Sequence, residues 1–375
     1  MHMVRTAGAG RPLEFQRPHV SILLASGCVL AAWFLAGPGR AREGQELASA
    51  VVFDRYSPLA SSEEIVRRTM SPIAADRIAS YLKDKRQQLP GQSIDLGKER
   101  FSLYVPQGEV PEQGYGLIVF IAPYDEAKIP PDWRKVFDRH HLIYAAAEKS
   151  GNDSNMLWRR LPLALHAYEN VAARYRLDPA RITISGWSGG SRTAMRVALS
   201  YPDVFRAAIL NSGADPFGNA GIAVPPAELF KLFQQRSRLV MVSGTEDVLI
   251  NMRDDEMRES ARKLCVQQPV SQPMRWVGHA LMDAQVLEKA IAAIESGATS
   301  NDVSRNPDLT VCRAGIQSEI DAGLARVRSL IGQHEKKSAG EEVSRIDARF
   351  GGLAAPDSVD LARAIVIMPS DANAH

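Results

Sequence analysis

The fold of this 375-residue chain is decided by the stretch Ile182-Thr183-Ile184-Ser185-Gly186-Trp187-Ser188-Gly189-Gly190-Ser191. Four strand-forming residues run into the pattern Gly-x-Ser-x-Gly, and a helix-forming stretch follows directly. This order is typical of a nucleophile elbow, in which a serine lies on a tight turn between a strand and a helix. Gly186 and Gly190 carry no Cβ atom that would clash in such a turn. The pattern predicts that Ser188 projects above a sheet edge, over the positive end of a helix; a glycine-rich loop without chemistry is the alternative.

Segments with strand character alternate with helical segments around this stretch. The strand segments are 101–105, 116–122, 142–146, 181–185, 207–211 and 239–243, and several of them are near-continuous apolar runs, as expected for strands covered on both faces. Helices are predicted at 132–139, 155–175, 191–200, 226–235 and 254–263, and Pro162 is expected to kink or restart the second of them. The alternation predicts an α/β fold with a mostly parallel, doubly wound sheet.

Helical patterns flank this α/β region on both sides. Residues 42–92 are predicted to form a helical N-terminal extension, residues 93–298 the α/β domain, and residues 299–375 a helical C-terminal extension. The connection between residues 211 and 239 is too short for a large cap domain, so a mostly open site is expected.

The first 41 residues have the composition of a targeting segment. Three arginines precede an uncharged, mostly apolar run at 20–37, which ends before Arg40 and Arg42. This order predicts a secretory signal peptide and export to the periplasm or the medium. An uncleaved anchor is the second interpretation, because the run is slightly short for a membrane span. A membrane partner is expected only in that second case.

Overall composition excludes several classes of partner. The chain has 45 basic and 43 acidic residues, so it has no charge excess that would attract nucleic acid. No histidine and cysteine cluster has metal-ligand spacing, and no glycine-rich phosphate loop follows a strand. We therefore expect no metal and no cofactor.

A serine hydroxyl becomes nucleophilic when a base takes its proton and a third group orients that base. In doubly wound folds with a serine nucleophile, these groups follow in the order serine, acid, histidine. Asp247 follows the strand segment 239–243, at the sheet edge where ligands bind in open parallel sheets. His279 is the downstream histidine that lies in a loop before a helix, not in the tail. Ser188, Asp247 and His279 are thus the candidate catalytic residues.

The acid has alternatives in the sequence. Glu246 is adjacent to Asp247, and Asp215 follows the preceding strand segment. Asp247 is also well placed to cap a helix without any catalytic part. The upstream histidines, which include His166, are expected to cap helices or to face solvent.

The negative oxygen that forms in acyl transfer needs two fixed N–H donors. One candidate is Gly189, the residue after the serine; the other is Tyr124, because Pro123 has no N–H. Trp187 is a candidate substrate contact, with packing beneath the elbow as the alternative. Asn152 and Asp153, in a loop after a strand, are further candidates for the pocket lining.

Two cysteines remain after the predicted signal peptide, Cys265 and Cys312. In an oxidising compartment two such thiols can pair, and the alternative is two unrelated buried thiols. Pairing would fasten the C-terminal extension beside the segment that carries His279.

Four motifs resemble those of a known superfamily. They are Asp178-Pro179-Ala180-Arg181, Gly186-Trp187-Ser188-Gly189-Gly190, Gly244-Thr245-Glu246-Asp247 and Gly278-His279. On these motifs, residues 93–298 are similar to the α/β-hydrolase superfamily, and within it to esterases related to polyhydroxybutyrate depolymerases and feruloyl esterases. The resemblance implies an α/β-hydrolase fold with Ser188, Asp247 and His279 as its catalytic triad. Relatives carry His-Gly where this chain has Ala122-Pro123.

The expected function is therefore that of an exported serine hydrolase. It would cleave a carboxylic ester, small or polymeric, through an acyl-enzyme, with Ser188 as nucleophile, His279 as base and Asp247 as the orienting acid. The alternatives are a serine peptidase, since the same triad cleaves amides, and a catalytically degenerate binding protein of the same fold.

Overall fold

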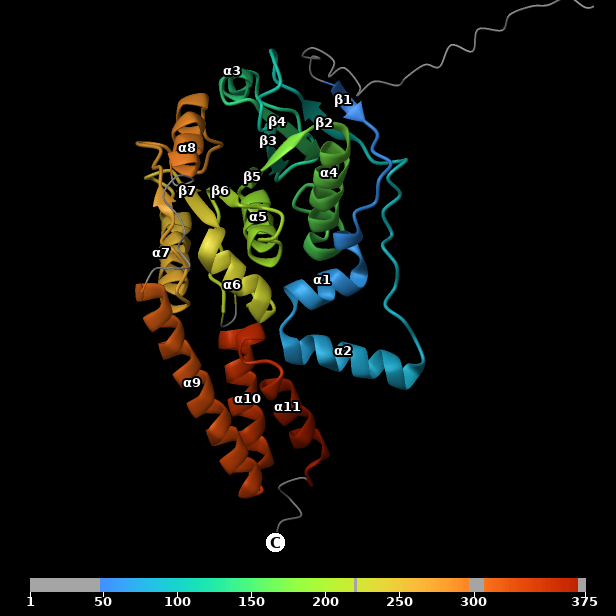
Figure 1. Cartoon of the computed structure of the whole chain (residues 1–375), viewed down its shortest axis with the longest axis vertical. Helices are drawn as coiled ribbons and strands as arrows, with labels where there is room; N and C mark the ends of the chain where they lie inside the picture. Colours follow the sequence, from blue (N-terminus) through green and yellow to red (C-terminus); the bar gives the residue numbers. More distant parts are fainter. Residues whose placement is uncertain (1–47, 219–220, 297–306, 370–375) are drawn as a thin grey trace, which may run out of the picture. The chain divides into compact units, whose positions relative to one another are not determined.

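The computed structural model describes residues 48–218, 221–296 and 307–369 (Figure 1). The predicted signal peptide or anchor at 1–41 lies outside these residues. Within the described ranges, no helix is both long and apolar enough to cross a bilayer.

The described residues contain one eight-stranded sheet in the order β1-β2-β4-β3-β5-β6-β7-β8. Strand β2 is antiparallel to both of its neighbours, and the other adjacent strands are parallel. The predicted mostly parallel sheet is confirmed, and all six predicted strand segments belong to it. The strands are β1 Ala48–Val51, β2 Phe101–Tyr104, β3 Tyr115–Ile121, β4 Leu142–Ala147, β5 Leu177–Trp187, β6 Ala207–Asn211, β7 Arg238–Val242 and β8 Val270–Ser271.

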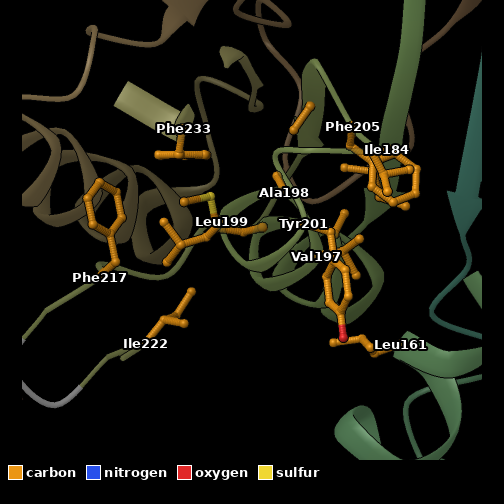
Figure 2. Close-up of a cluster of buried hydrophobic side chains, with 14 of the residues drawn as sticks. Leu161, Ile184, Val197, Ala198, Leu199, Tyr201, Phe205, Phe217, Ile222 and Phe233 are labelled. Atoms are coloured by element: carbon orange, nitrogen blue, oxygen red, sulfur yellow. The ribbon is translucent and has the colours of Figure 1, made fainter. Parts of the chain in front are cut away.

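Helices cover both faces of the sheet because successive side chains of a strand point to opposite sides. Leu117, Val119 and Ile121 of β3 join the apolar cluster that α4 and α5 cover, whereas Ile118 and Phe120 join the cluster that α3 and α8 cover. Figure 2 shows part of the first cluster. The helices of this region are α3 Arg134–Arg139, α4 Leu161–Arg174, α5 Gly189–Ser200, α6 Ala227–Arg236, α7 Val248–Lys263 and α8 Ala284–Ser296.

Short helical turns complete this region. A π-helix at Met156–Arg160 precedes α4, so the predicted helix at 155–175 restarts just before Pro162, as expected. A 3-10 helix at Pro131–Trp133 leads into α3.

The N-terminal extension differs from the prediction in one respect, because its described part includes strand β1 at the sheet edge. The pairing of β1 with β2 depends on a partner about 50 residues away, which the local pattern does not reveal. The expected helices follow as η1 Pro58–Ala60, α1 Ser62–Thr69 and α2 Pro72–Lys85. Ser61 and Ser71 cap the two longer helices through their side-chain oxygens.

Two side chains of α4 hold the segment between β1 and η1. The backbone N–H groups of Asp54 and Arg55 donate to Asn170 Oδ1, at 3.2 and 3.0 Å. The N–H of Ser57 donates to His166 Nδ1 at 3.0 Å. His166 is therefore buried in the interior, and the expectation that it caps a helix or faces solvent is wrong. The local sequence does not reveal this burial, because Ser57, which His166 binds, lies more than a hundred positions away in the chain.

The C-terminal extension consists of α9 Pro307–Gly332, α10 Lys336–Phe350, the 3-10 turn Gly351–Leu353 and α11 Asp357–Ile367. These helices pack on one another and on α2. Ser71 donates to the buried Asp347 at 2.5 Å, and Arg363 pairs with Asp76. The two extensions are thus joined to each other.

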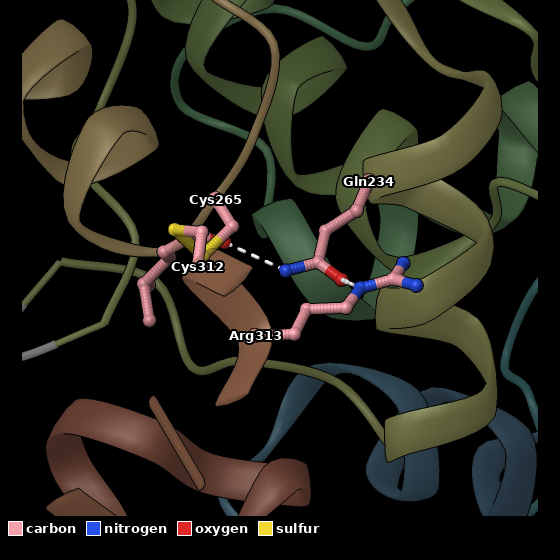
Figure 3. The surroundings of a disulfide bond; sticks show 5 residues. Gln234, Cys265, Cys312 and Arg313 are labelled. Carbon is pink, nitrogen blue, oxygen red and sulfur yellow. Dashed lines mark hydrogen bonds between the residues drawn. A yellow bond between two sulfur atoms is a disulfide. The ribbon is translucent and has the colours of Figure 1, made fainter. Parts of the chain in front are cut away.

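A disulfide between Cys265 and Cys312 fastens α9 to the chain just after α7 (Figure 3). The two cysteines are therefore paired, and the alternative of two unrelated buried thiols does not hold. Gln234 of α6 supports the junction by donating to Leu264 O at 2.8 Å and accepting from Arg313 Nε at 2.8 Å.

Removing the disulfide should destabilise the protein. The bond closes a loop with a sequence separation of 47 residues, and loop-closure entropy then predicts about 4 kcal/mol of unfolding free energy. We expect the free energy of unfolding in urea to be lower by about this amount in the double variant Cys265→Ser, Cys312→Ser. Wild type treated with reductant should show the same decrease. Two free thiols in untreated, unfolded wild type would contradict the bond.

His166 should make the protein sensitive to acid. Burial lowers the pKa of His166 from 6.5 to about 4. Between pH 6.5 and pH 4, His166 binds a proton in the unfolded chain but not in the folded chain. The free energy of unfolding therefore has its full value above pH 6.5 and falls by up to about 3 kcal/mol as the pH drops toward 4. His166→Asn keeps an acceptor for Ser57 and should lose this part of the pH dependence.

The measurement is urea unfolding at pH 7, 5.5 and 4.5 for wild type and His166→Asn. His334→Asn, at an exposed position, is the matched control and should follow wild type. An unchanged pH dependence in His166→Asn would show that other groups cause the acid sensitivity.

Candidate active site

Ser188 lies on the turn between β5 and α5, as the sequence predicts. It has a φ of 54° and a ψ of −122°, a conformation that a non-glycine residue adopts only under strain. Two hydrogen bonds hold the turn: the N–H of Ser188 donates to Asn211 O at 2.9 Å, and the N–H of Arg192 donates to Ser188 O at 3.1 Å.

The two predicted glycines are required by close backbone approaches. A Cβ on Gly186 would lie 2.5 Å from the carbonyl carbon of Gly190. A Cβ on Gly190 would lie 1.9 Å from the carbonyl oxygen of Ile121, at the end of β3. Neither distance is compatible with a side chain, so the first turn of α5 packs directly against two strand ends.

The structure brings together the three residues predicted as nucleophile, base and acid. His279 Nε2 lies 2.8 Å from Ser188 Oγ, and His279 Nδ1 lies 2.6 Å from Asp247 Oδ2. A carboxylate accepts hydrogen bonds, so Nδ1 is the protonated nitrogen and Nε2 is free to accept from the serine hydroxyl. This is the arrangement in which a histidine takes the proton of a serine.

The loops that carry the acid and the histidine are joined to each other. The N–H of Glu246 donates to Val277 O, and the N–H of Thr245 donates to Met274 O, each at 3.0 Å. A Cβ on Gly244 would lie 2.1 Å from Gly278 O, so this glycine permits the loops to touch. The spacing of Asp247 and His279 is therefore set by backbone contacts, not by the two side chains alone.

The other interpretations of the acid do not fit. Asp247 occupies the N-cap position of α7, yet its side chain makes no cap hydrogen bond and points to His279. Asp215 is buried and bound to three arginines. The carboxylate of Glu246 contacts Thr245, its neighbour in the chain.

Three aromatic rings line the site in a row. The ring of Tyr124 meets Trp187 edge-on, with centroids 5.8 Å apart. The ring of Trp187 stacks on the imidazole of His279, with centroids 5.9 Å apart. Trp187 therefore packs against the histidine, and its contact with a substrate stays a prediction.

Arg160 is a buried residue near the site that the sequence does not single out. It donates from Nε to Ser150 O at 2.9 Å, from Nη1 to Gly189 O at 3.1 Å and from Nη2 to Ala122 O at 2.9 Å. Those carbonyls belong to the loop after β4, the elbow, and the end of β3. Arg160 thus ties together the three backbone segments that meet around Ser188.

The charge of Arg160 is held by carbonyl dipoles. No carboxylate pairs with it among the residues that the structure describes, and burial lowers its pKa to about 10. It remains protonated at neutral pH. An arginine in a helical pattern is usually exposed, so nothing in the local sequence marks it.

The loop after β4 also reaches the elbow through Asn152. Its N–H donates to Pro123 O at 2.9 Å. Its side-chain oxygen lies so close to Gly189 that a Cβ there would be 2.1 Å away. Asn152 is therefore beside both predicted oxyanion donors, Gly189 and Tyr124. Asn152 and Asp153 are both exposed. The roles of these four residues toward a substrate stay predictions.

Comparisons with known proteins give distant structural similarities. No family model and no curated protein matches the chain. Among solved structures, a putative dipeptidyl aminopeptidase IV from Bacteroides ovatus is 14% identical with a TM-score of 0.40, over 53% of this chain and 34% of that one. Thermogutta terrifontis esterase 2 phosphonylated by sarin is 16% identical with a TM-score of 0.38, over 56% of this chain and 95% of that one.

A further similar structure comes from a study of two prolyl endopeptidases; it is 13% identical with a TM-score of 0.37, over 53% of this chain and 36% of that one. The chain thus spans about a third of the length of both peptidases. These scores are too low to carry a functional argument. The fold itself is the predicted α/β-hydrolase fold: a mostly parallel sheet, a serine elbow after β5, and only α6 between β6 and β7 in the described residues.

Proposed function

We propose that the protein is a serine hydrolase that cleaves carboxylic esters through an acyl-enzyme. The observation that carries the proposal is the chain of hydrogen bonds from Ser188 Oγ through His279 to Asp247. In this proposal Ser188 is the nucleophile, His279 the general base and then the general acid, and Asp247 the group that orients the imidazole.

The first half-reaction forms the acyl-enzyme. Ser188 Oγ attacks the ester carbonyl carbon while His279 Nε2 takes the hydroxyl proton. The tetrahedral intermediate collapses when the bond to the alcohol oxygen breaks, and His279 gives its proton to that oxygen. Water then attacks the acyl carbon while His279 Nε2 takes its proton. The bond to Ser188 Oγ breaks, His279 gives the proton to Oγ, and the carboxylic acid leaves. Asp247 stabilises the imidazolium in both steps.

The oxyanion of each intermediate would lie at the N-terminus of α5. The N–H of Gly189 is the first donor, supported by the positive end of that helix. The N–H of Tyr124 is the proposed second donor. Its position depends on the Ala122-Pro123 segment, which Arg160 and Asn152 hold in place through the two carbonyl oxygens of that segment.

Two features support an ester as substrate. The side chain of His279 is 41% exposed, so the reacting atoms face an open surface suited to bulky or polymeric esters. In the described residues, the hydrogen bonds of His279 go to Ser188 and Asp247, and none joins the triad side chains to either extension. An ester carbonyl is also less stabilised by resonance than an amide carbonyl, and an alkoxide leaves more readily than an amide anion, so ester cleavage demands less of the site than peptide cleavage.

Export is part of the proposal. The bond between Cys265 and Cys312 is of a kind that persists in oxidising compartments and is rare in the cytosol. It supports the periplasm or the exterior as the place of action, in agreement with the signal-like sequence at 1–41. The proposed partner is an ester substrate, and no cofactor takes part.

Ser188→Ala should abolish hydrolysis of short p-nitrophenyl esters while the protein stays folded. Because members of a triad act as a unit, we expect kcat to fall by at least about a thousandfold. Ser154→Ala, in the loop after β4, is the matched control and should retain activity. Undiminished turnover in Ser188→Ala would overturn the proposal, and cleavage of peptides but not esters would indicate a peptidase.

Arg160→Met should lower kcat more than it raises KM. Without the guanidinium the segments around Ser188 lose their common donor, and a displacement of about 1 Å at the donors costs about a hundredfold. Arg160→Lys retains the charge but only one donor centre, and should fall between wild type and Arg160→Met. The readout is kcat and KM for p-nitrophenyl butyrate, at a temperature where each variant is folded by circular dichroism.

Arg159→Met is the control for this series. Arg159 is adjacent in the chain but binds none of the three carbonyls that Arg160 binds. It pairs with the largely buried Glu99 and donates to Lys149 O, so its loss should leave kcat close to wild type. An equal effect of both substitutions, or a change in KM alone, would show that Arg160 does not position the oxyanion donors.

A further inference from the structure

A groove of about 700 Å³ opens beside the elbow, between α5 and α7. Arg192 and Arg196 line it from α5, and Leu249, Met252 and Arg253 line it from α7. At its floor lies Asp215, in the loop after β6. No part of the proposed catalytic machinery accounts for these residues.

Three guanidinium groups converge on the single carboxylate of Asp215. Arg192 Nε lies 2.8 Å from Oδ1, Arg196 Nη1 lies 2.5 Å from Oδ2, and Arg253 Nη1 lies 3.2 Å from Oδ1. Burial acts to raise the pKa of Asp215, but hydrogen bonds from Arg196 and Arg192 hold it below its usual value. The carboxylate is therefore charged, and one negative charge faces three positive ones. Two positive charges remain unbalanced within the cluster.

The cluster has donors to spare on its open side. Among the described residues, the two Nη groups of Arg192 and the Nη2 of Arg253 make no hydrogen bond. The side chains of Arg192 and Arg253 are 42% and 49% exposed, whereas that of Asp215 is 3% exposed. Asp215 thus binds Arg192 Nε and Arg253 Nη1 and leaves the other donors of these two guanidinium groups available to a second anion.

Neighbouring acidic side chains lie farther along the groove. Glu256 and Glu259 line it beyond Met252, and Glu259 is paired with Arg262 and Lys263. No ion pair joins either of them to Arg192 or Arg253 in the described residues. The positive excess is thus confined to the end of the groove that Arg192, Arg196 and Arg253 form.

This end of the groove adjoins the backbone of Ser188. Arg192 lies one helical turn after Ser188, and its N–H donates to Ser188 O. A Cβ on Gly213 would lie 2.7 Å from Ser188 O and 3.3 Å from Arg192 Cγ, so both residues meet the same point of the β6 loop. On the other wall, α7 begins one residue after Asp247.

The wall of α7 is also apolar. Leu249 and Met252 are 75% and 59% exposed and face the groove. An anion held by the arginines would place an attached hydrocarbon chain against them. A guanidinium matches the planar, two-oxygen geometry of a carboxylate.

We propose that this groove is a carboxylate-binding subsite, and that the preferred substrates are esters that carry a free carboxylate on an apolar chain. The proposal rests on the proposed esterase function. Arg192 and Arg253 bind the carboxylate, Asp215 and Arg196 position them, and Leu249 and Met252 contact the chain. The subsite determines specificity and takes no part in bond cleavage.

The test compares substrates that differ only in one charge. On the acyl side, mono-p-nitrophenyl adipate is compared with its methyl ester; on the alcohol side, 4-acetoxybenzoate is compared with methyl 4-acetoxybenzoate. We expect kcat/KM to be at least about tenfold higher for the acid in one of the two pairs. This preference should shrink as sodium chloride is raised, because salt screens exposed charges.

Variants locate the preference. Arg192→Gln and Arg253→Gln should each reduce the ratio of kcat/KM for the acid to kcat/KM for the neutral ester several-fold, and Arg192→Lys should retain part of this ratio. Arg262→Gln, at an exposed position on the same helix, is the matched control. Free adipate should inhibit cleavage of the neutral ester competitively in wild type and less in Arg253→Gln, a readout that does not need Arg192 variants to fold.

The outcomes separate the subsite from the enzyme. Equal rates for acid and neutral ester in both pairs, with activity that depends on Ser188, would overturn the subsite and leave the esterase proposal standing. A preference that survives both glutamine variants would also overturn it. If folded protein cleaves none of the four esters, the proposed function itself is overturned.

Discussion

The close approach of α5 to the end of β3 is the constraint on which the site depends. Gly190 lies so near the carbonyl of Ile121 that no side chain fits between them. This contact holds the first turn of α5 against the end of β3. Ser188, two residues before Gly190, has its strained conformation at this turn. The strain persists because hydrogen bonds to β6 and within α5 hold both sides of the serine.

Arg160 extends the same constraint to the surrounding loops. Its three donors reach the end of β3, the elbow and the loop after β4, so a displacement of one of these segments would disturb the other two. Burying a cation without a carboxylate costs free energy, and the carbonyl dipoles offset that cost only while all three are in place. This arrangement supports the Ala122-Pro123 segment from a helical turn that lies later in the chain.

Local patterns in the sequence predict the six central strands, the elbow, and the order of Ser188, Asp247 and His279. They succeed because periodicity, glycine geometry and chain order are local or sequential properties. They miss β1, whose partner strand is remote, and the burial of His166, which depends on a backbone segment far away in the chain. Arg160 and the arginines around Asp215 are missed for the same reason. The role of a charged residue depends on the groups around it in space, and the local sequence does not show those groups.

The most direct test of the central claim is whether Ser188 is activated as a nucleophile. A fluorophosphonate reacts with a serine hydroxyl only when a base takes its proton, and it loses fluoride as the serine oxygen bonds to phosphorus. Folded protein should be labelled once per chain, with mass spectrometry placing the phosphonyl group on Ser188, and His279→Ala should not be labelled. Folded wild-type protein that stays unlabelled, or that carries the label on another residue, would contradict a Ser188–His279–Asp247 catalytic centre.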